Sequence, residues 1–149
     1  MSLAMTKRER EAFLAGVHVG VISIEEPGRG PLCVPIWYDY RPGGELWIIT
    51  DRGSRKGKLL EAAGRFSLCA QSESVPYKYV SVEGPIVSVE TKDIERVARP
   101  MAHRYLGPEL GEKYLEAVSA EAARGETACF RMRPERWLSV DYAKQFSQL

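Results

Sequence analysis

The chain has 149 residues and a mass of 16.7 kDa, with 44% hydrophobic and 28% charged residues, as expected for one ordinary globular domain. Its 21 basic and 20 acidic residues nearly cancel, which argues against a nucleic acid as the main partner because no long basic face is present. No apolar run has the length of a membrane span and the N-terminus lacks a signal peptide's apolar core, so we expect a cytoplasmic protein that does not bind membranes.

The predicted elements begin with a short helix. We interpret Met1–Ala4, ahead of Met5, as the remnant of an expression tag and leave it out of the fold prediction. Thr6 and Glu9 have the spacing of a capping box, in which each side chain binds the backbone N–H of the other residue. Gly16 is predicted to end this helix.

Three strands are predicted next, separated by turns rich in glycine and proline. Pro35 lies within the second of them and has no N–H to donate, so it marks an edge strand or a bulge. The predicted strands are Val17–Glu25, Leu32–Tyr40 and Glu45–Thr50.

A helix and two further strands follow. The helix runs from about Ser54 to Ala63, and Gly64 is predicted to end it as a left-handed C-terminal residue. Arg65–Gln71 is predicted to be a strand, and Tyr77–Glu90 is a longer strand with strong alternation. Gly84–Pro85 should bend this long strand, as barrel corners require.

The last third contains two predicted helices and two predicted strands. Thr91 is expected to cap a helix that reaches about Leu106, and Pro108 to start a second helix that ends at Gly125. The final strands are predicted at residues 127–133 and 137–142. Consecutive strands joined by short turns cannot form a parallel βαβ sheet, so we predict one mainly β (α+β) domain over residues 1–149, an antiparallel barrel decorated by helices.

The cysteines and histidines do not form a metal-binding pattern. Cys33, Cys69 and Cys129 are far apart, each in an apolar strand-like run, and are predicted to be small buried residues in a reducing compartment. His18 and His103 are well separated and no Cys-x-x-Cys occurs, so no metal site is expected.

A basic cluster, Arg52–Lys58, lies where the third strand leads into a helix. A helix start offers unpaired N–H groups and a partial positive charge, which suit a phosphate. Ser54 could cap the helix or donate to a phosphate, Arg55 could bind it with two N–H groups, and Lys56 would add charge. The alternative is a solvated basic helix face with an ordinary serine cap. The spacing fits neither a P-loop nor a Rossmann nucleotide site.

The order of these motifs resembles that of the pyridoxamine 5′-phosphate oxidase-like family. This family consists of flavin-binding split barrels and includes flavin- and deazaflavin-dependent oxidoreductases. The match covers about residues 12–89, and residues 133–137 and 141–144 resemble the family more loosely. The resemblance rests on the segments Pro35–Tyr38, Gly44–Thr50, Gly53–Lys56 and Tyr79–Pro85.

The resemblance implies a cofactor site. Thr50 and the Ser-Arg-Lys element match the part of the family that binds the phosphate, and Pro35–Trp37 matches the strand whose backbone lies along the isoalloxazine ring. Trp137 falls near a C-terminal segment that approaches the cofactor, whereas packing in the core or a dimer interface is an alternative for Trp37 and Trp47. The implied cofactor-binding residues are Pro35, Ile36, Trp37, Thr50, Arg52, Ser54, Arg55, Lys56, Lys58, Lys78 and Trp137.

The implied cofactor is FMN or, alternatively, the deazaflavin coenzyme F-420, whose oligoglutamate tail carries additional carboxylates. Arg52, Lys58 and Lys78 could meet that tail, although surface cations are usually just solvated. The resemblance also implies a homodimer with each cofactor between two barrels. Trp37, Trp47 and Trp137 would offer aromatic surface for such an interface.

The expected function is hydride transfer to or from a small organic substrate at the bound cofactor. Such a reaction needs no nucleophile–base pair, and we assign no catalytic residue. The chain ends Lys144–Leu149 where true pyridoxamine phosphate oxidases carry an Arg-x-His motif, so oxidation of vitamin B6 is not expected. The alternative is a non-catalytic flavin, haem or other tetrapyrrole binding protein, but neither histidine has the signature of a haem ligand.

Two further segments have alternative interpretations. Met101–Gly107, within the helical segment Thr91–Gly125, could be a substrate lid or a helix packing face. Tyr77–Tyr79 could stack on a ring or hold an anionic tail through Lys78, or its tyrosines could simply pack.

Overall fold

The computed structural model describes residues 2–146 and contains eight strands and five helices within that range. The strands are β1 (Gly20–Ile24), β2 (Leu32–Ile36), β3 (Asp39–Tyr40), β4 (Leu46–Asp51), β5 (Arg65–Gln71), β6 (Lys78–Glu90), β7 (Thr127–Met132) and β8 (Arg136–Asp141). The helices are α1 (Lys7–Ala15), α2 (Arg55–Ala63), α3 (Glu95–Ala117), α4 (Ser119–Ala122) and α5 (Ala143–Phe146).

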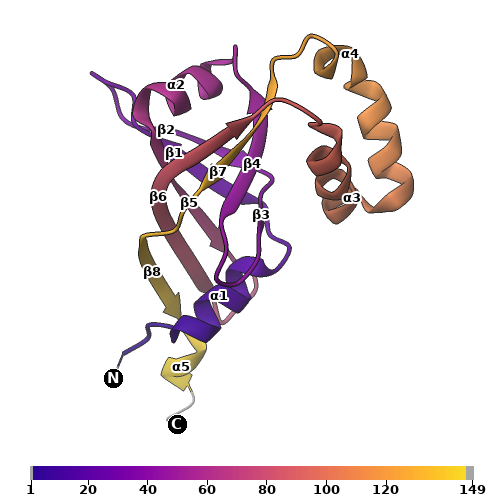
Figure 1. The fold of residues 1–149 in the computed structure, drawn as a ribbon. Helices are drawn as coiled ribbons and strands as arrows, with labels where there is room; N and C mark the ends of the chain where they lie inside the picture. The colour runs from indigo at the N-terminus through magenta and orange to yellow at the C-terminus, as the bar shows by residue number, and fades with distance from the viewer. Residues whose placement is uncertain (1, 147–149) are drawn as a thin grey trace.

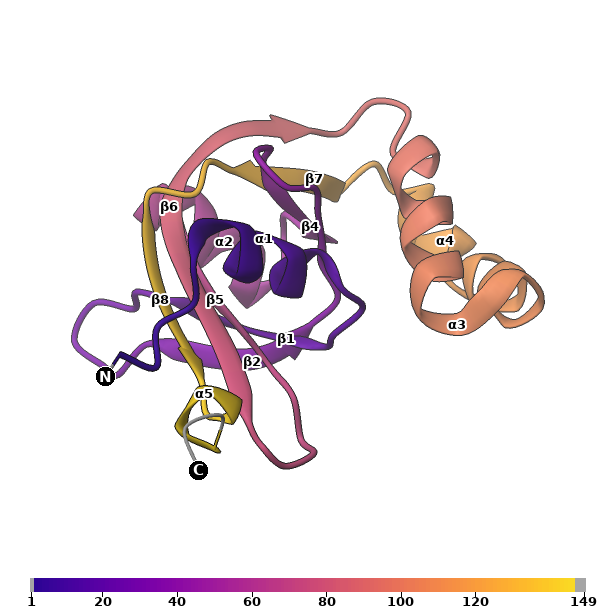
Figure 2. The same cartoon turned by 90° about the horizontal axis from the view of Figure 1, so that it is seen from below.

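The strands form a strongly curled antiparallel sheet in the order β2-β1-β5-β6-β7-β4-β3, and β8 pairs with β6. This is the predicted split barrel. Helices α3 and α4 stand to one side of it (Figure 1). Seen from below, α1 lies across the opening of the barrel (Figure 2).

Strand β6 joins the two halves of the barrel. Its first part pairs with β5 and β8, and from Ile86 onward it pairs with β7, with a shift of register between Ile86 and Ser88. The change of partner comes directly after Gly84–Pro85, which confirms the predicted bend. Val80 and Val82 point into the core, as the alternation of this segment predicts.

The predicted second strand, Leu32–Tyr40, is wrong as a single element, because the structure divides it into β2 and β3. The hydroxyl of Tyr105 accepts a hydrogen bond from the N–H of Tyr38 and lies 2.9 Å from the carbonyl of Tyr38. The backbone of Tyr38 is therefore engaged by a side chain rather than by a neighbouring strand. Pro35 lies in β2, at the edge of the sheet, as predicted.

Most helix ends lie at the residues predicted from the sequence. The capping box of Thr6 and Glu9 is present, Ser54 caps α2, and Gly64 ends α2 with φ 68°. The predicted cap at Thr91 is wrong, because α3 begins at Glu95 and Ile94 precedes it without a side-chain cap.

Three further differences concern exposure and extent. Cys33 is exposed on the edge strand β2, contrary to the prediction, whereas Cys129 is buried in β7. The first strand starts at Gly20, not at Val17. Helix α5 was not expected from the sequence.

Candidate functional site

A cavity of about 750 Å³ lies between one side of the barrel and helices α3 and α4. This volume is within the range of small-molecule sites. The barrel wall is formed by the end of β2, by β4 and by the start of β7, and the helical wall by residues 94–123. The barrel wall includes Pro35, Ile36, Trp37, Ile49, Thr50 and Thr127.

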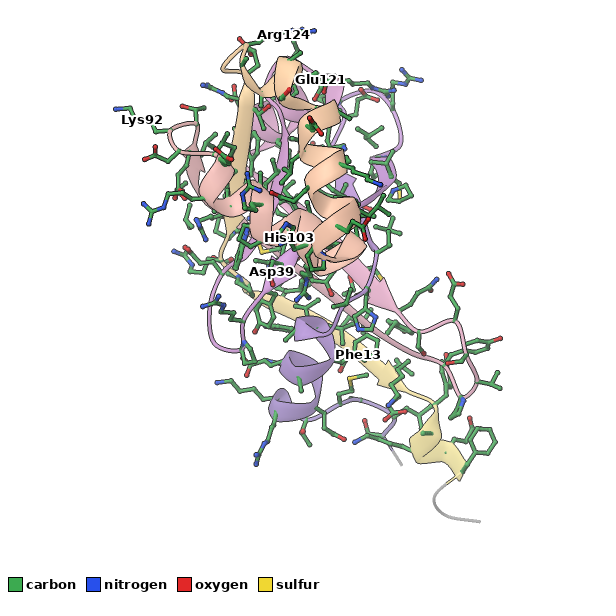
Figure 3. All side chains as sticks on the ribbon, turned by 90° about the vertical axis from the view of Figure 1, so that its right-hand side faces the viewer. Phe13, Asp39, Lys92, His103, Glu121 and Arg124 are labelled. Atoms are coloured by element: carbon green, nitrogen blue, oxygen red, sulfur yellow. The ribbon has the colours of Figure 1, made fainter. Side chains whose placement is uncertain are left out.

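The helical wall depends on a break within α3. Gly107 has φ 81° and ψ 170°, a backbone conformation that is essentially restricted to glycine, and it divides α3 into two arms. The carboxylate of Glu112 in the second arm pairs with Arg99 and with His103 in the first arm, the latter at 2.9 Å. Figure 3 shows α3 from its outer side and labels His103 on its first arm.

Two neighbouring side chains attach α3 to the barrel. The guanidinium of Arg104 donates to the carbonyls of Ala15 and Gly16 at 3.0 and 2.8 Å, and lies 3.4 Å from the Asp39 carboxylate. The hydroxyl of Tyr105 lies 2.7 Å from the carbonyl of His18, and burial raises the pKa of this phenol. We call Arg104 and Tyr105 the α3 latch.

The same latch positions Trp37, which lies on the barrel wall of the cavity. Its ring stacks on Tyr105 with centroids 5.0 Å apart and an interplanar angle of 4°. Tyr114 from the second arm of α3 packs against Trp37 at 5.1 Å. Trp37 therefore packs against side chains of its own chain, as the alternative interpretation expects, and it also lines the cavity.

The start of α2 follows directly after the cavity residues Thr50 and Asp51. The Ser54 hydroxyl lies 2.6 Å from the carbonyl of Asp51 and accepts from the N–H of Gly57 at 3.1 Å. Gly57 permits this packing, because a Cβ here would lie 2.2 Å from the carbonyl oxygen of Asp51. The serine therefore caps the helix in this structure and fixes the helix start beside β4.

Lys56 is half-buried in the first turn of α2, and burial lowers the pKa of its ammonium group. No ion-pair or hydrogen-bond partner for this side chain occurs among the residues that the structure describes. A half-buried cation without a partner carries a desolvation cost that an anion would offset. This feature fits a phosphate at the helix start.

The other predicted cations have acidic partners or lie elsewhere. Arg55 forms an ion pair with Glu26, which holds the pKa of that carboxyl below its ordinary value. Arg52 pairs with Glu61 at 2.6 Å. Lys58 is exposed and has no side-chain partner in the described part of the chain. The ammonium group of Lys78 lies 4.0 Å from Asp141.

Trp137 is not among the residues that line the cavity. Its ring meets Tyr40 edge to face at 6.0 Å, and the guanidinium of Arg10 lies 4.6 Å from its centroid. Trp47 likewise packs under Arg131 at 5.0 Å. Of the eleven predicted site residues, the structure brings only Pro35, Ile36, Trp37 and Thr50 to the cavity.

Sequence reasoning missed most of the helical wall. Met101 was singled out as part of either a lid or a packing face, and it is both buried and on the cavity surface. Leu115, Val118 and Ala122 carry no motif, and the sequence predicts only that one helix ends near Leu106 and another begins at Pro108. No group of three potential metal ligands occurs in the described residues.

The family model for pyridoxamine 5′-phosphate oxidase matches residues 6–141 of the chain. The chain belongs to this family. The matched segment includes every strand of the barrel, the residues that line the cavity and the start of α2. It agrees with the resemblance seen in the sequence.

Solved structures share the fold at low sequence identity. An F-420 reductase has a TM-score of 0.69 at 17% identity, over 86% of this chain and 94% of its own. The conserved hypothetical protein Rv2991 from Mycobacterium tuberculosis has a TM-score of 0.73 at 23% identity, over 97% and 89%. A heme binding protein from Mycobacterium smegmatis has a TM-score of 0.62 at 15% identity, over 93% and 55%.

At these identities, the likeness shows that the pyridoxamine 5′-phosphate oxidase fold is shared and nothing finer. No curated protein matches the chain at a significant level. Among the described residues, no helix is both long enough and apolar enough to cross a membrane.

Proposed function

We propose that the protein is an oxidoreductase that binds FMN, or alternatively the deazaflavin F-420, and transfers a hydride to or from a small organic substrate. One observation carries the proposal: Pro35–Trp37 and Thr50, which sequence resemblance assigns to the cofactor, line one cavity that lies beside the start of α2. A flavin or deazaflavin supplies the hydride chemistry when bound, and the protein orients it and excludes water.

The cofactor phosphate would lie at the first turn of α2. Lys56 offers an uncompensated charge there, and the first turn of a helix offers unpaired N–H groups that suit an anion. Arg55 can join only by leaving or sharing Glu26. The isoalloxazine ring would lie along Pro35 and Ile36 on the barrel wall.

FMN is the first choice between the two cofactors. The tail of F-420 would need positive charge beyond the phosphate, and the residues assigned to it were Arg52, Lys58 and Lys78. Two of these three already have an acidic side chain within 4.0 Å. This leaves little spare charge for additional carboxylates.

A haem function is less well supported by the geometry. The Nε2 atom of His18 lies 2.9 Å from the carbonyl of Phe13, and burial lowers the pKa of this ring. His103 is bound to Glu112. Neither of these histidines lines the cavity, so neither is placed to be an axial ligand of a haem bound there.

The proposal is tested by titrating the purified protein with FMN and with F-420 and following cofactor fluorescence. We expect binding of FMN, and a loss of affinity of about tenfold or more in the double variant Arg55→Ala/Lys56→Ala, because charge-assisted hydrogen bonds to the phosphate are lost. Lys7→Ala, an exposed change on α1, is the charge control. Unchanged affinity in the double variant would show that the basic run is only a solvated helix face.

We also propose that the protein is a homodimer. The three tryptophans that first suggested an interface are in contact with other side chains of the same chain. The outer face of the sheet offers a different surface for a partner.

A further inference from the structure

The two walls of the cavity differ in chemistry. If the barrel wall takes the cofactor ring, as proposed above, the helical wall is the side that remains for the substrate. A hydride donor and acceptor must approach to roughly 3–3.5 Å, so the substrate has to lie flat between the ring and this wall. The inference that follows therefore rests on the proposed function.

The interior of the helical wall is apolar. Ile94, Ala98 and Met101 come from the first arm of α3 and the residue that precedes it, and Leu115 and Val118 come from the second arm and its end. Tyr114 adds an aromatic edge against Trp37. Such a surface binds an apolar or aromatic body by excluding water, but it offers few groups that could pair with a polar substrate.

The charged side chains on the cavity surface are all acidic. Glu95 and Glu121 lie on the helical wall and Asp51 on the barrel wall, and no lysine or arginine is among the described residues that line the cavity. Glu95 pairs with Arg99. The carboxylate of Glu121, near the top of the view in Figure 3, has no partner among the described residues.

We propose that the substrate is a flat, apolar molecule that is neutral or cationic, and that the helical wall rejects anions. A negative group placed on this wall would face the carboxylate of Glu121, which no described residue pairs, with Glu95 nearby in its ion pair with Arg99. A cationic group would be attracted instead. This preference for a neutral or cationic group is opposite in sign to the preference expected at the start of α2, where the cofactor phosphate would bind. One protein thus separates an anionic cofactor from a non-anionic substrate by the charge of two neighbouring surfaces.

The test uses three redox-inert probes that share one aromatic body: naphthylmethanol, naphthyl-trimethylammonium and naphthalene sulfonate. Isothermal titration calorimetry measures their binding to the protein loaded with the cofactor that it retains. We expect the cationic probe to bind about tenfold more tightly than the sulfonate at low salt, with a smaller ratio at high salt. Equal affinities, or a preference for the sulfonate, would overturn the inference.

Two variants locate the effect. Glu95→Gln/Glu121→Gln should reduce the cation-to-sulfonate ratio at least about threefold, while Glu116→Gln, an exposed change on α3 away from the cavity, should leave it unchanged. Ala98→Trp should block all three probes by filling the helical wall. An unaltered ratio in the double variant would assign the selection to other charges and contradict the proposal.

Cofactor binding is measured in parallel by fluorescence in every variant. Ala98→Trp should keep the cofactor, because Ala98 lies on the substrate side. If no probe binds while the cofactor does, the substrate inference fails and the proposed function stands. If neither cofactor binds the unaltered protein, the proposed function itself fails, and this inference fails with it.

Discussion

Lys56 lies at the candidate phosphate site, and no side chain in the described part of the chain compensates its charge. Burial lowers its pKa from the ordinary value of 10.5, so its charge begins to be lost at a lower pH than for an exposed lysine. A bound phosphate reverses this effect, because it stabilises the protonated form. We therefore expect the affinity for a phosphate-bearing cofactor to depend on pH through Lys56.

We predict that the affinity for FMN is constant around neutral pH and falls as the pH rises through the lowered pKa of Lys56 in the free protein. The sign follows because only the protonated ammonium attracts the phosphate. Fluorescence titrations from neutral to alkaline pH measure this fall. Lys56→Arg should move it to higher pH, and Lys56→Met should remove it while weakening binding throughout. A fall that persists in Lys56→Met would point to another group.

Glu26 would compete with a cofactor phosphate for Arg55 at the same site. The two side chains form an ion pair in this structure, between the first residue of α2 and the segment that follows β1. We predict that Glu26→Gln strengthens FMN binding about twofold or more, since Arg55 no longer has to leave a carboxylate to reach the phosphate. Glu61→Gln, which frees Arg52 in the same manner, is the matched control and should have little effect. Weaker binding in Glu26→Gln would mean that Glu26 positions Arg55 for the phosphate.

At the scale of elements, α3 is attached to the barrel mainly through the latch. The hydroxyl of Tyr105 contacts the carbonyl of His18 and both backbone groups of Tyr38, while its ring stacks on Trp37. The latch therefore fixes the helical wall and the end of β2 together. Loss of the Tyr105 hydroxyl should therefore loosen both the helical wall and the end of β2.

We predict that Tyr105→Phe lowers the free energy of unfolding by about 1–3 kcal/mol, because buried backbone groups lose their partner while the stacked ring is kept. Urea unfolding followed by tryptophan fluorescence measures the change. Tyr114→Phe is the control, since Tyr114 also packs on Trp37 but its hydroxyl has no hydrogen-bond partner in the described structure. Equal effects of the two changes would show that the hydroxyl of Tyr105 contributes nothing.

The elements whose boundaries are set by local chemistry could be predicted from sequence. The capping box at Thr6, the serine cap at Ser54 and the glycine at Gly64 each satisfy backbone groups within a few residues, so their patterns are readable. The division of Leu32–Tyr40 could not be foreseen, because it depends on Tyr105, which is 67 residues away from Tyr38.

The candidate site divides in the same way. The start of α2 and the segment Pro35–Trp37 are contiguous motifs, and in the structure the first lies beside the cavity and the second on its wall. The partners of Arg55 and Lys78 are distant in sequence, so the compensation of these two charges is not visible in the sequence. The helical wall is made of ordinary apolar residues, and only folding gives them a shared surface.

At the scale of the whole molecule, no helix of residues 2–146 covers the outer face of the sheet formed by β2, β1, β5, β6 and β8 (Figure 2). Paired residues on neighbouring strands point to the same face. One row across this face contains no charged side chain and consists of Pro35, Val21, Cys69, Ser81 and Leu138. Leu138 is 61% exposed, and the row ends at Pro35, which also lines the cavity.

We predict that a second copy of the chain covers this face, giving a two-fold dimer in which each cavity is closed at the Pro35 edge by the partner. Light scattering at micromolar concentration should give twice the mass of 16.7 kDa. Leu138→Lys should produce monomers, because it places a charge in an apolar interface, and it should also weaken FMN binding. Leu110→Lys, an exposed change on α3, is the matched control. A mass near 16.7 kDa for the unaltered protein would contradict the dimer; a dimer that survives Leu138→Lys would place the interface on another face.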